Sequence, residues 1–327
     1  MTGQVFAIGD ALVLQSRAAE VMACVGEIAM RMLGSCVLAL LLWCPGAGAA
    51  CPPSGHDAAT LRELKAHEFA VADAGERQRL AVGLLDCLGD PDPALRDGIA
   101  YEALSTWMRG GQLTDPTLAA LLDGLLPMLS AEDAAGFRRP FAALVLSEVA
   151  RTDRLRPWLS APERARLVAA IGDYLAGVRD HRGFVDGEGW RHGVAHASDV
   201  VLQLALNPAL DAAQLDRLRD AVAVQVAPAD GHAYIHGEPL RLARSIVFIA
   251  RRGTHDGSEW ERWLQGVAAP APLPDWNAAF SSESGLARRH NVVAFLSALY
   301  LLASEQDDVP TRDRLLPGLR EALRKIP

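Results

Sequence analysis

Apolar residues recur at helical spacing along most of this chain, and this pattern restricts its fold more than any other feature. Beyond Pro53, apolar positions at i, i+3 and i+4 predict helices separated by short segments rich in Pro, Gly and Asp, and strand patterns are almost absent. The chain is therefore predicted to be all-α. The predicted helices span residues 61–71, 77–88, 94–108, 116–129, 140–150, 162–178, 190–206, 212–227, 239–252, 259–267, 287–304 and 312–324.

The spacing of the predicted helices favours a repeated arrangement. They pair at intervals of about 40 to 47 residues, which is the spacing of HEAT-like helical repeats. Pro116, Pro162 and Pro239 stand in predicted first turns, where a missing N–H costs nothing. We therefore expect residues 51–327 to form a single all-helical domain, a HEAT-like α/α superhelix or toroid of helical hairpins. An irregular helical bundle is the alternative.

The N-terminal region resembles a secretory signal peptide. Residues 30–50 contain one positive charge, an apolar run from Leu33 to Trp43 and small residues before a plausible cleavage site. Translation is then expected to start at Met30 or Met32. In that case residues 1–29 precede the true start and are not part of the protein. The apolar run is too short to span a membrane comfortably, and no transmembrane segment is predicted in the mature chain.

These features predict a periplasmic or secreted protein. A lipoprotein anchored through Cys51 is one alternative, and a cytoplasmic protein with a hydrophobic N-terminal helix is another. Cys51 and Cys87 remain after cleavage and can form a disulfide in an oxidising compartment. No Cys-x-x-Cys pair exists, which argues against thiolate zinc sites and thioredoxin-like chemistry. The net charge of −8 argues against a nucleic-acid partner.

One polar stripe lies on the otherwise apolar helix predicted over residues 190–206. His192, His196 and Asp199 follow one another at i, i+4 and i+7, within an arc of about 60°. A helix that is apolar nearly all round is buried, so the stripe is expected to face an internal cleft. Imidazole and carboxylate groups suit a divalent metal ion, and the same three residues can also act as acid/base groups. The alternative is a structural ladder of buried hydrogen bonds.

Two further segments carry residues of the same kind. Asp186, Glu188 and Trp190 lie in a glycine-rich loop just before the stripe, where they can bind a sugar or take part in acid/base catalysis. An N-cap with a Trp lid over the core is the alternative reading of that loop. The second segment has its histidines and glutamate immediately before a predicted helix. Its candidate binding residues are His232, His236, Glu238 and Arg241.

The segment from Tyr174 to Asp199 resembles a bacterial family known as domain of unknown function 2785. Its most specific part is Gly-Trp-x-His-x-x-Ala-His-x-x-Asp over residues 189–199, with related segments at 139–146 and 237–243. The similarity extends over about residues 90–305, although Pro239 and Leu240 stand where the family usually has a second acidic residue. The resemblance implies an all-helical fold and no established activity.

Two classes of function agree with these features. In the first, the protein is a hydrolase of an envelope-derived substrate, either metal-assisted or acid/base, with Glu188, His192, His196 and Asp199 as catalytic residues. In the second, it is a non-catalytic helical-repeat module that binds a small molecule, peptide, glycan or protein partner. The sequence leaves open whether the protein is an enzyme.

Overall fold

Capping side chains determine where several helices begin. In the computed structural model, which describes residues 51–327, the Ser160 hydroxyl accepts a hydrogen bond from Glu163 N–H at the start of α8. Asp211 and Asp256 cap α10 and α12 in the same way, through Gln214 and Glu259. Each is a capping box, in which the third helical residue bonds back to the cap and two backbone N–H groups are satisfied.

Helices account for most of the described chain, which confirms the all-α prediction. In chain order the elements are α2 (Ala58–Ala66), α3 (Ala74–Gly83), η1 (Leu84–Gly89), α4 (Pro93–Leu95), η2 (Arg96–Tyr101), α5 (Glu102–Arg109), α6 (Asp115–Met128), α7 (Arg138–Leu155), α8 (Ala161–Gly177), β1 (Phe184–Val185), β2 (Gly189–Trp190), α9 (Gly193–Ala205), α10 (Ala212–Val226), α11 (Glu238–Arg251), α12 (Gly257–Val267), η3 (Asn277–Ser281), α13 (Glu283–Ser304) and α14 (Val309–Arg324).

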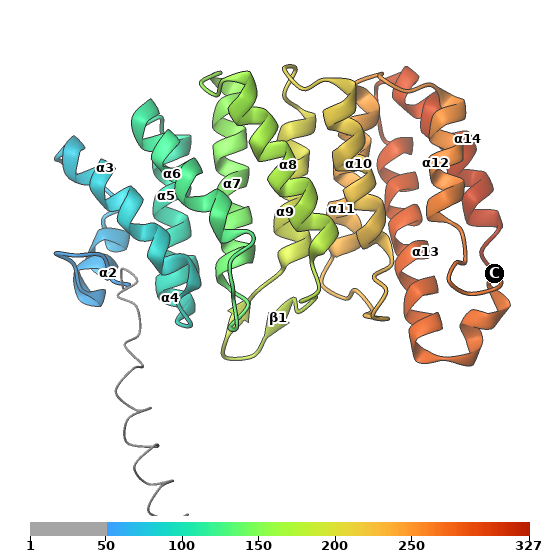
Figure 1. Cartoon of the computed structure of the whole chain (residues 1–327), viewed down its shortest axis with the longest axis horizontal. Helices are drawn as coiled ribbons and strands as arrows, with labels where there is room; N and C mark the ends of the chain where they lie inside the picture. The colour runs from blue at the N-terminus through green and yellow to red at the C-terminus, as the bar shows by residue number, and fades with distance from the viewer. Residues whose placement is uncertain (1–50) are drawn as a thin grey trace, which may run out of the picture. The chain divides into compact units, whose positions relative to one another are not determined.

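The helices pack side by side in two rows (Figure 1). The first row is α5, α7, α9, α11 and α13, in which each helix contacts the next. In the second row α6 packs on α7, α8 on α9 and α10 on α11, so each pair forms a helical hairpin. Helices α7, α9 and α11 all begin at the end where the β1–β2 hairpin lies, and we call this the loop end (Figure 1).

A short hairpin interrupts the helical pattern and shifts the start of α9. Phe184 pairs with Trp190 in an antiparallel register, and the N–H groups of Arg191 and His192 donate to the carbonyls of Gly183 and Arg182. The helix predicted from residue 190 therefore begins only at Gly193. The prediction was wrong at this end because Trp190 is part of a strand and His192 has a left-handed backbone, and a helix cannot run through either.

The N-terminal part of the described chain is closed by a disulfide. Cys51 and Cys87 are bonded across a sequence separation of 36, which confirms the predicted pairing. None of the helices in residues 51–327 combines the length and apolar character that crossing a bilayer requires. The predicted signal peptide and the extension before it lie outside the described residues.

Candidate functional site

Two helix starts meet at the loop end and bring three titratable side chains together. His192 is the N-cap of α9 in a left-handed conformation with φ 57°, and Glu238 is the first residue of α11. Nε2 of His192 lies 3.4 Å from Oε1 of Glu238, and Nδ1 of His236 lies 3.9 Å from the same oxygen. We call His192, His236 and Glu238 the His–Glu cluster.

The facing atoms of the His–Glu cluster are buried and incompletely paired. Glu238 is 2% exposed and His192 is 9% exposed. Within residues 51–327, none of the three facing atoms has a partner at hydrogen-bond geometry. Unpaired buried polar atoms are rare because each carries a desolvation cost, and proteins keep them mainly where a function requires them. Other buried polar atoms are also unpaired, but here three from titratable side chains face one another, which makes the cluster the candidate site.

The carboxyl group of Glu238 is ionised at neutral pH. Burial by itself raises its pKa, but the contact with His192 and a 3.0 Å hydrogen bond from His236 N–H outweigh burial, so the pKa lies below its ordinary value. Its position at the N-terminus of α11 also favours a negative charge. Glu238 can therefore hold a proton on Nε2 of His192 and stabilise an imidazolium at that residue.

Aromatic rings cover one side of the His–Glu cluster. Trp190 stacks on His192 with 4.8 Å between ring centroids, and its ring lies 5.7 Å from that of His236 in an edge arrangement. Phe184 lies 5.2 Å from Trp190 on the paired strand. Trp190 is 38% exposed and Phe184 is 44% exposed. The cluster thus lies beneath an aromatic surface that remains open to solvent.

Two arginines hold the β1–β2 hairpin in place. The buried side chain of Arg96 donates to the carbonyl of Glu188 at 2.9 Å and lies 3.9 Å from the ring centroid of Phe137. Arg191 binds the carboxylate of Glu188 at 2.6 Å. Gly189 has φ 82°, and a Cβ there would come within 3.0 Å of Arg96 Nη2, so glycine fits this position best. No sequence pattern pointed to Arg96.

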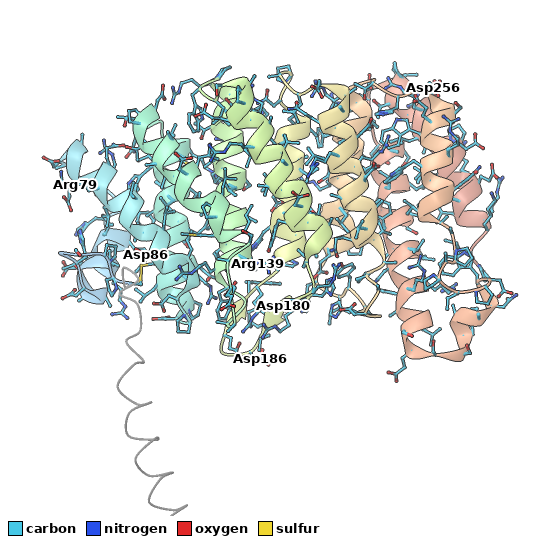
Figure 2. The ribbon with its side chains drawn as sticks, in the orientation of Figure 1. Arg79, Asp86, Arg139, Asp180, Asp186 and Asp256 are labelled. Carbon is cyan, nitrogen blue, oxygen red and sulfur yellow. A yellow bond between two sulfur atoms is a disulfide. The ribbon has the colours of Figure 1, made fainter. Side chains whose placement is uncertain are left out.

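Several predicted site residues lie away from the cluster. Asp186 is exposed at the tip of the hairpin (Figure 2). The carboxylate of Glu188 is engaged by Arg191. His232 stacks on His181 with 5.4 Å between ring centroids, at the opposite side of the loop that carries His236. Of these three, none contributes a side chain to the His–Glu cluster.

The predicted polar stripe of α9 is divided among different partners. Nδ1 of His196 donates to the carbonyl of Pro140 at 3.1 Å, and Asp199 forms an ion pair with Arg241 of α11. Within residues 51–327, no three or more His, Cys, Asp or Glu side chains are grouped so as to hold a metal ion. The geometry therefore gives no support to a metal site at His192, His196 and Asp199.

Asp199, and Gln203 one turn further along α9, contact neighbouring helices of the first row. Arg154 of α7 donates to Gln203 of α9 at 3.0 Å, in addition to the pair of Asp199 with Arg241. Arg109 of α5 binds Glu148 of α7 at 2.9 Å. Burial raises the pKa of Asp199 in spite of its arginine partner. Asp199 and Gln203 are thus satisfied as links between helices.

His196 is expected to make stability fall in acid. Burial, with a smaller effect from His192, lowers its pKa from 6.5 to about 3, so the folded protein keeps the ring neutral. As the pH falls below about 6.5 the unfolded chain takes up a proton that the folded chain refuses, and stability is lost. Between about pH 7.5 and about pH 5 this group alone should cost roughly 2 kcal/mol.

The measurement for this expectation is urea unfolding at both pH values for the wild type and His196→Gln. Glutamine can still donate to the Pro140 carbonyl but does not titrate. The variant should lose roughly 2 kcal/mol less stability than the wild type over the same pH interval. Equal pH dependence in the two proteins would show that His196 does not stay neutral.

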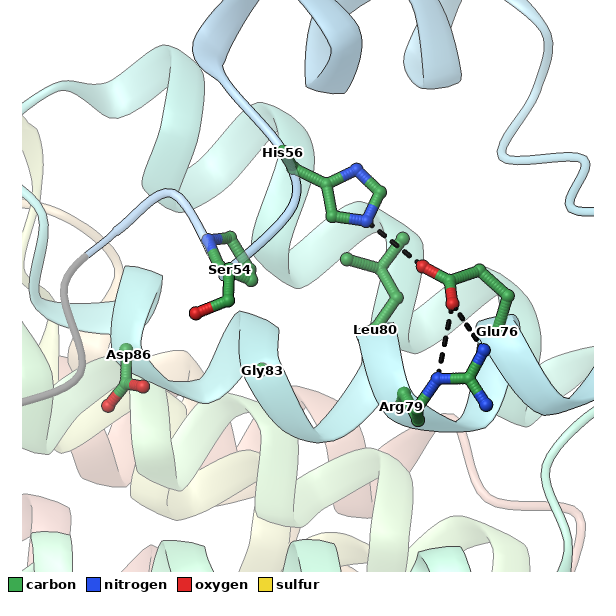
Figure 3. Close-up of a pocket in the computed structure, with 8 residues that line it drawn as sticks. Ser54, His56, Glu76, Arg79, Leu80, Gly83 and Asp86 are labelled. Carbon is green, nitrogen blue, oxygen red and sulfur yellow. Dashed lines mark hydrogen bonds and ion pairs between the residues drawn. The ribbon is translucent and has the colours of Figure 1, made fainter.

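The described cavities do not coincide with the His–Glu cluster. A cavity of about 350 Å³ near the disulfide is lined by His56, Glu76 and Arg79, among others (Figure 3). There His56 Nε2 lies 3.2 Å from Glu76, and Arg79 binds the same carboxylate at 2.6 Å. Because these charged groups already satisfy one another at an open surface, this cavity is a weaker candidate for chemistry.

Comparisons with known proteins give one match. The model of a family described as "Protein of unknown function (DUF2785)" matches residues 125–301, which include the β1–β2 hairpin and the whole His–Glu cluster. Neither the curated proteins nor the solved structures contain a match to this chain. The matched region confirms the resemblance seen in the sequence.

Proposed function

The chain belongs to the DUF2785 family of proteins of unknown function, and from its own residues we propose that it is an acid/base hydrolase. The observation that carries this proposal is the buried, ionised carboxylate of Glu238 facing Nε2 of His192 at 3.4 Å. A carboxylate that holds one nitrogen of an imidazole leaves the other nitrogen available as a base. Such a pair is a common arrangement for proton transfer.

In the proposed reaction His192 acts first as a base and then as an acid. Glu238 keeps the proton on Nε2, so Nδ1 carries the lone pair, and no hydrogen bond to Nδ1 is found among residues 51–327. Nδ1 removes a proton from water as its oxygen attacks the substrate. The resulting imidazolium, stabilised by Glu238, returns that proton to the leaving group as its bond breaks, which balances the step.

The surroundings of the pair suit a substrate with an apolar or ring-shaped part. Trp190 and Phe184 offer exposed aromatic surface beside His192. The N-termini of α9 and α11 carry partial positive charge, which stabilises negative charge that develops on the substrate. With the signal peptide predicted at residues 30–50, we place the protein in the periplasm or outside the cell, acting on an envelope-derived substrate.

A binding module remains the second candidate, because the exposed rings of Trp190 and Phe184 can hold a partner at the loop end without any reaction. The two rows of helical hairpins and their spacing support a HEAT-like arrangement, and such arrays commonly bind extended partners. In this alternative, the loop end would bind a peptide, glycan or protein without altering it.

Glu238→Gln should slow hydrolysis by about 10²-fold, because it removes the charge that stabilises the His192 imidazolium. The assay uses chromogenic ester and glycoside substrates together with purified cell-wall fragments. Glu188→Gln is the matched control, since Glu188 is also a loop-end glutamate but its carboxylate binds Arg191. That control should keep close to wild-type activity.

The two candidate functions give different results in this assay. Turnover by the wild type that Glu238→Gln and Glu188→Gln reduce equally would remove Glu238 from the proposed mechanism. If the wild type binds cell-wall fragments without releasing any product from these probes, the binding module is favoured over the hydrolase.

A further inference from the structure

His181 is a further buried histidine that is not part of the His–Glu cluster. His181 lies between α8 and the β1–β2 hairpin, with its side chain 2% exposed. Its Nδ1 is 2.8 Å from Oδ2 of Asp230, and its Nε2 is 3.3 Å from Oε1 of Gln225. Each ring nitrogen therefore faces an oxygen atom.

The orientation of Gln225 is fixed by its other contacts. Its amide nitrogen donates to the carbonyls of Leu175 and Val178, at 2.8 and 3.1 Å. The opposite assignment would place the amide oxygen against two carbonyl oxygens, so Oε1 must face His181, where it also accepts from the Tyr234 hydroxyl at 3.1 Å. An amide oxygen can only accept, and Nε2 of His181 must therefore carry a proton.

The other nitrogen of His181 faces a carboxylate. Burial by itself raises the pKa of Asp230, but hydrogen bonds from His232 N–H and from His181 outweigh it, so the pKa is lowered and Asp230 is a carboxylate that only accepts. Both nitrogens of His181 therefore face oxygen atoms that only accept, an arrangement that suits an imidazolium. Burial and the nearby His181 charge lower the pKa of His232, whose neutral ring stacks on His181 at 5.4 Å.

This buried charge anchors the loop that leads into α11. Residues 227–237 contain Asp230 and Tyr234, which contact His181 and its partner Gln225, and they also contain His236. We propose that His181 is a positioning residue whose imidazolium fixes this loop and so holds His236 and Glu238 against His192. Losing one ring proton removes the hydrogen bond to Asp230 or to Gln225 and loosens this side of the loop, while Asn291 continues to bind the backbone of His232 and Tyr234.

The surroundings of His181 contain few other charges. Asp180 and Arg182 flank it in sequence and form an ion pair with each other. The groups that contact it from packed elements are Asp230, His232 and Tyr234 of the loop and Gln225 of α10, whose amide binds the Leu175 and Val178 carbonyls at the end of α8. His290 and Asn291 of α13 bind the backbone of the same loop, and Glu238 of α11 is charged near His232. Asp230 is the one that directly balances the imidazolium charge.

The experiment follows Trp190 and His181 by NMR in residues 51–327 from about pH 5 to about pH 9, which covers and extends beyond the range of about pH 5 to 8 where unperturbed histidines titrate. Trp190 reports on the loop because its ring lies 5.7 Å from His236. Fluorine-labelled tryptophan gives a separate signal for each indole, and Trp190→Phe identifies the relevant one. We expect a pH transition in the Trp190 signal that coincides with loss of a proton from His181 and is separate from any effect of His192, whose ring stacks directly on Trp190.

His181→Gln should abolish that transition, and Asp230→Asn should shift it toward lower pH because the imidazolium loses its counter-ion. His255→Gln is the matched control, since His255 is a buried histidine 2.7 Å from Asp216 at a distance from the loop. It should leave the Trp190 transition unchanged. Circular dichroism checks that each variant folds.

Two results would overturn the proposal. One is a nitrogen chemical shift showing that His181 carries a single proton at about pH 6 in the folded protein. The other is a folded His181→Gln protein in which the Trp190 transition and the His236 signals match those of the wild type. Neither readout requires catalysis, so failure of the proposed hydrolase would leave this test intact.

Discussion

Replacing Asp153 by alanine should destabilise the fold by about 3 to 5 kcal/mol, the cost of leaving a buried charge without its partner. Asp153 is 1% exposed and binds the guanidinium of Arg164 at 2.9 and 3.1 Å. It also accepts from Asn207 and from the N–H groups of Trp158 and Leu159. Alanine would leave Arg164 buried and uncompensated between α7 and α8.

The measurement is urea unfolding followed by circular dichroism, with Asp173→Ala as the matched control. Asp173 and Arg217 also pair between neighbouring helices, α8 and α10, but both are largely exposed. Exposed pairs contribute about 0 to 1 kcal/mol, so the control should lie close to the wild type. Similar losses in the two variants would show that burial does not determine the value of the Asp153 pair.

Helix starts were the most predictable part of this fold, because capping is local. Pro116, Pro162 and Pro239 each stand in the first turn of a helix, in α6, α8 and α11, as expected. A cap needs only a few neighbouring residues, so its signal is present in the sequence itself. The all-α fold followed from the same local patterns.

The start of α9 was not predictable in the same way, because it depends on contacts outside the helix. The hairpin register and the support from Arg96, almost 100 residues away from Glu188 along the chain, place Trp190 on a strand. His192 then becomes the N-cap in a left-handed conformation, rather than the first member of a helical stripe. Helical spacing alone therefore grouped His192 with His196 and Asp199.

The sequence pointed to histidine and glutamate side chains, but it did not show which of them lie against one another. The two histidine-containing segments do approach each other, through His192 and Glu238. Arg241, a candidate binding residue beside Glu238 in the sequence, pairs with Asp199 of the other segment. The reason is that α9 and α11 begin at the same end and lie side by side, which puts a later turn of α11 level with Asp199.

The supporting residues of the site carried no signal in the sequence. Gln225 lies 44 residues from His181, and Asn291 lies 57 residues from Tyr234, whose N–H it binds. Single polar residues on otherwise ordinary helices resemble surface positions until the packing of the rows is known. For this reason the buried contacts of His181 could not be inferred before the structure.

Loss of the disulfide should cost about 3 to 4 kcal/mol in the chain-entropy model, because the bond closes a loop of 36 residues in the unfolded chain. It joins Cys51 to Cys87 of η1, whose side chain is fully buried. The test compares the urea unfolding of two oxidised proteins spanning residues 51–327, the wild type and the Cys51→Ser/Cys87→Ala variant. Alanine is used at position 87 because it avoids burying a hydroxyl.

Thiol titration and peptide mapping of the oxidised protein verify the bond. Two free thiols in that protein would show that the pair does not form, whereas an intact bond with equal stability of the two proteins would show that the unfolded chain is not restricted by it.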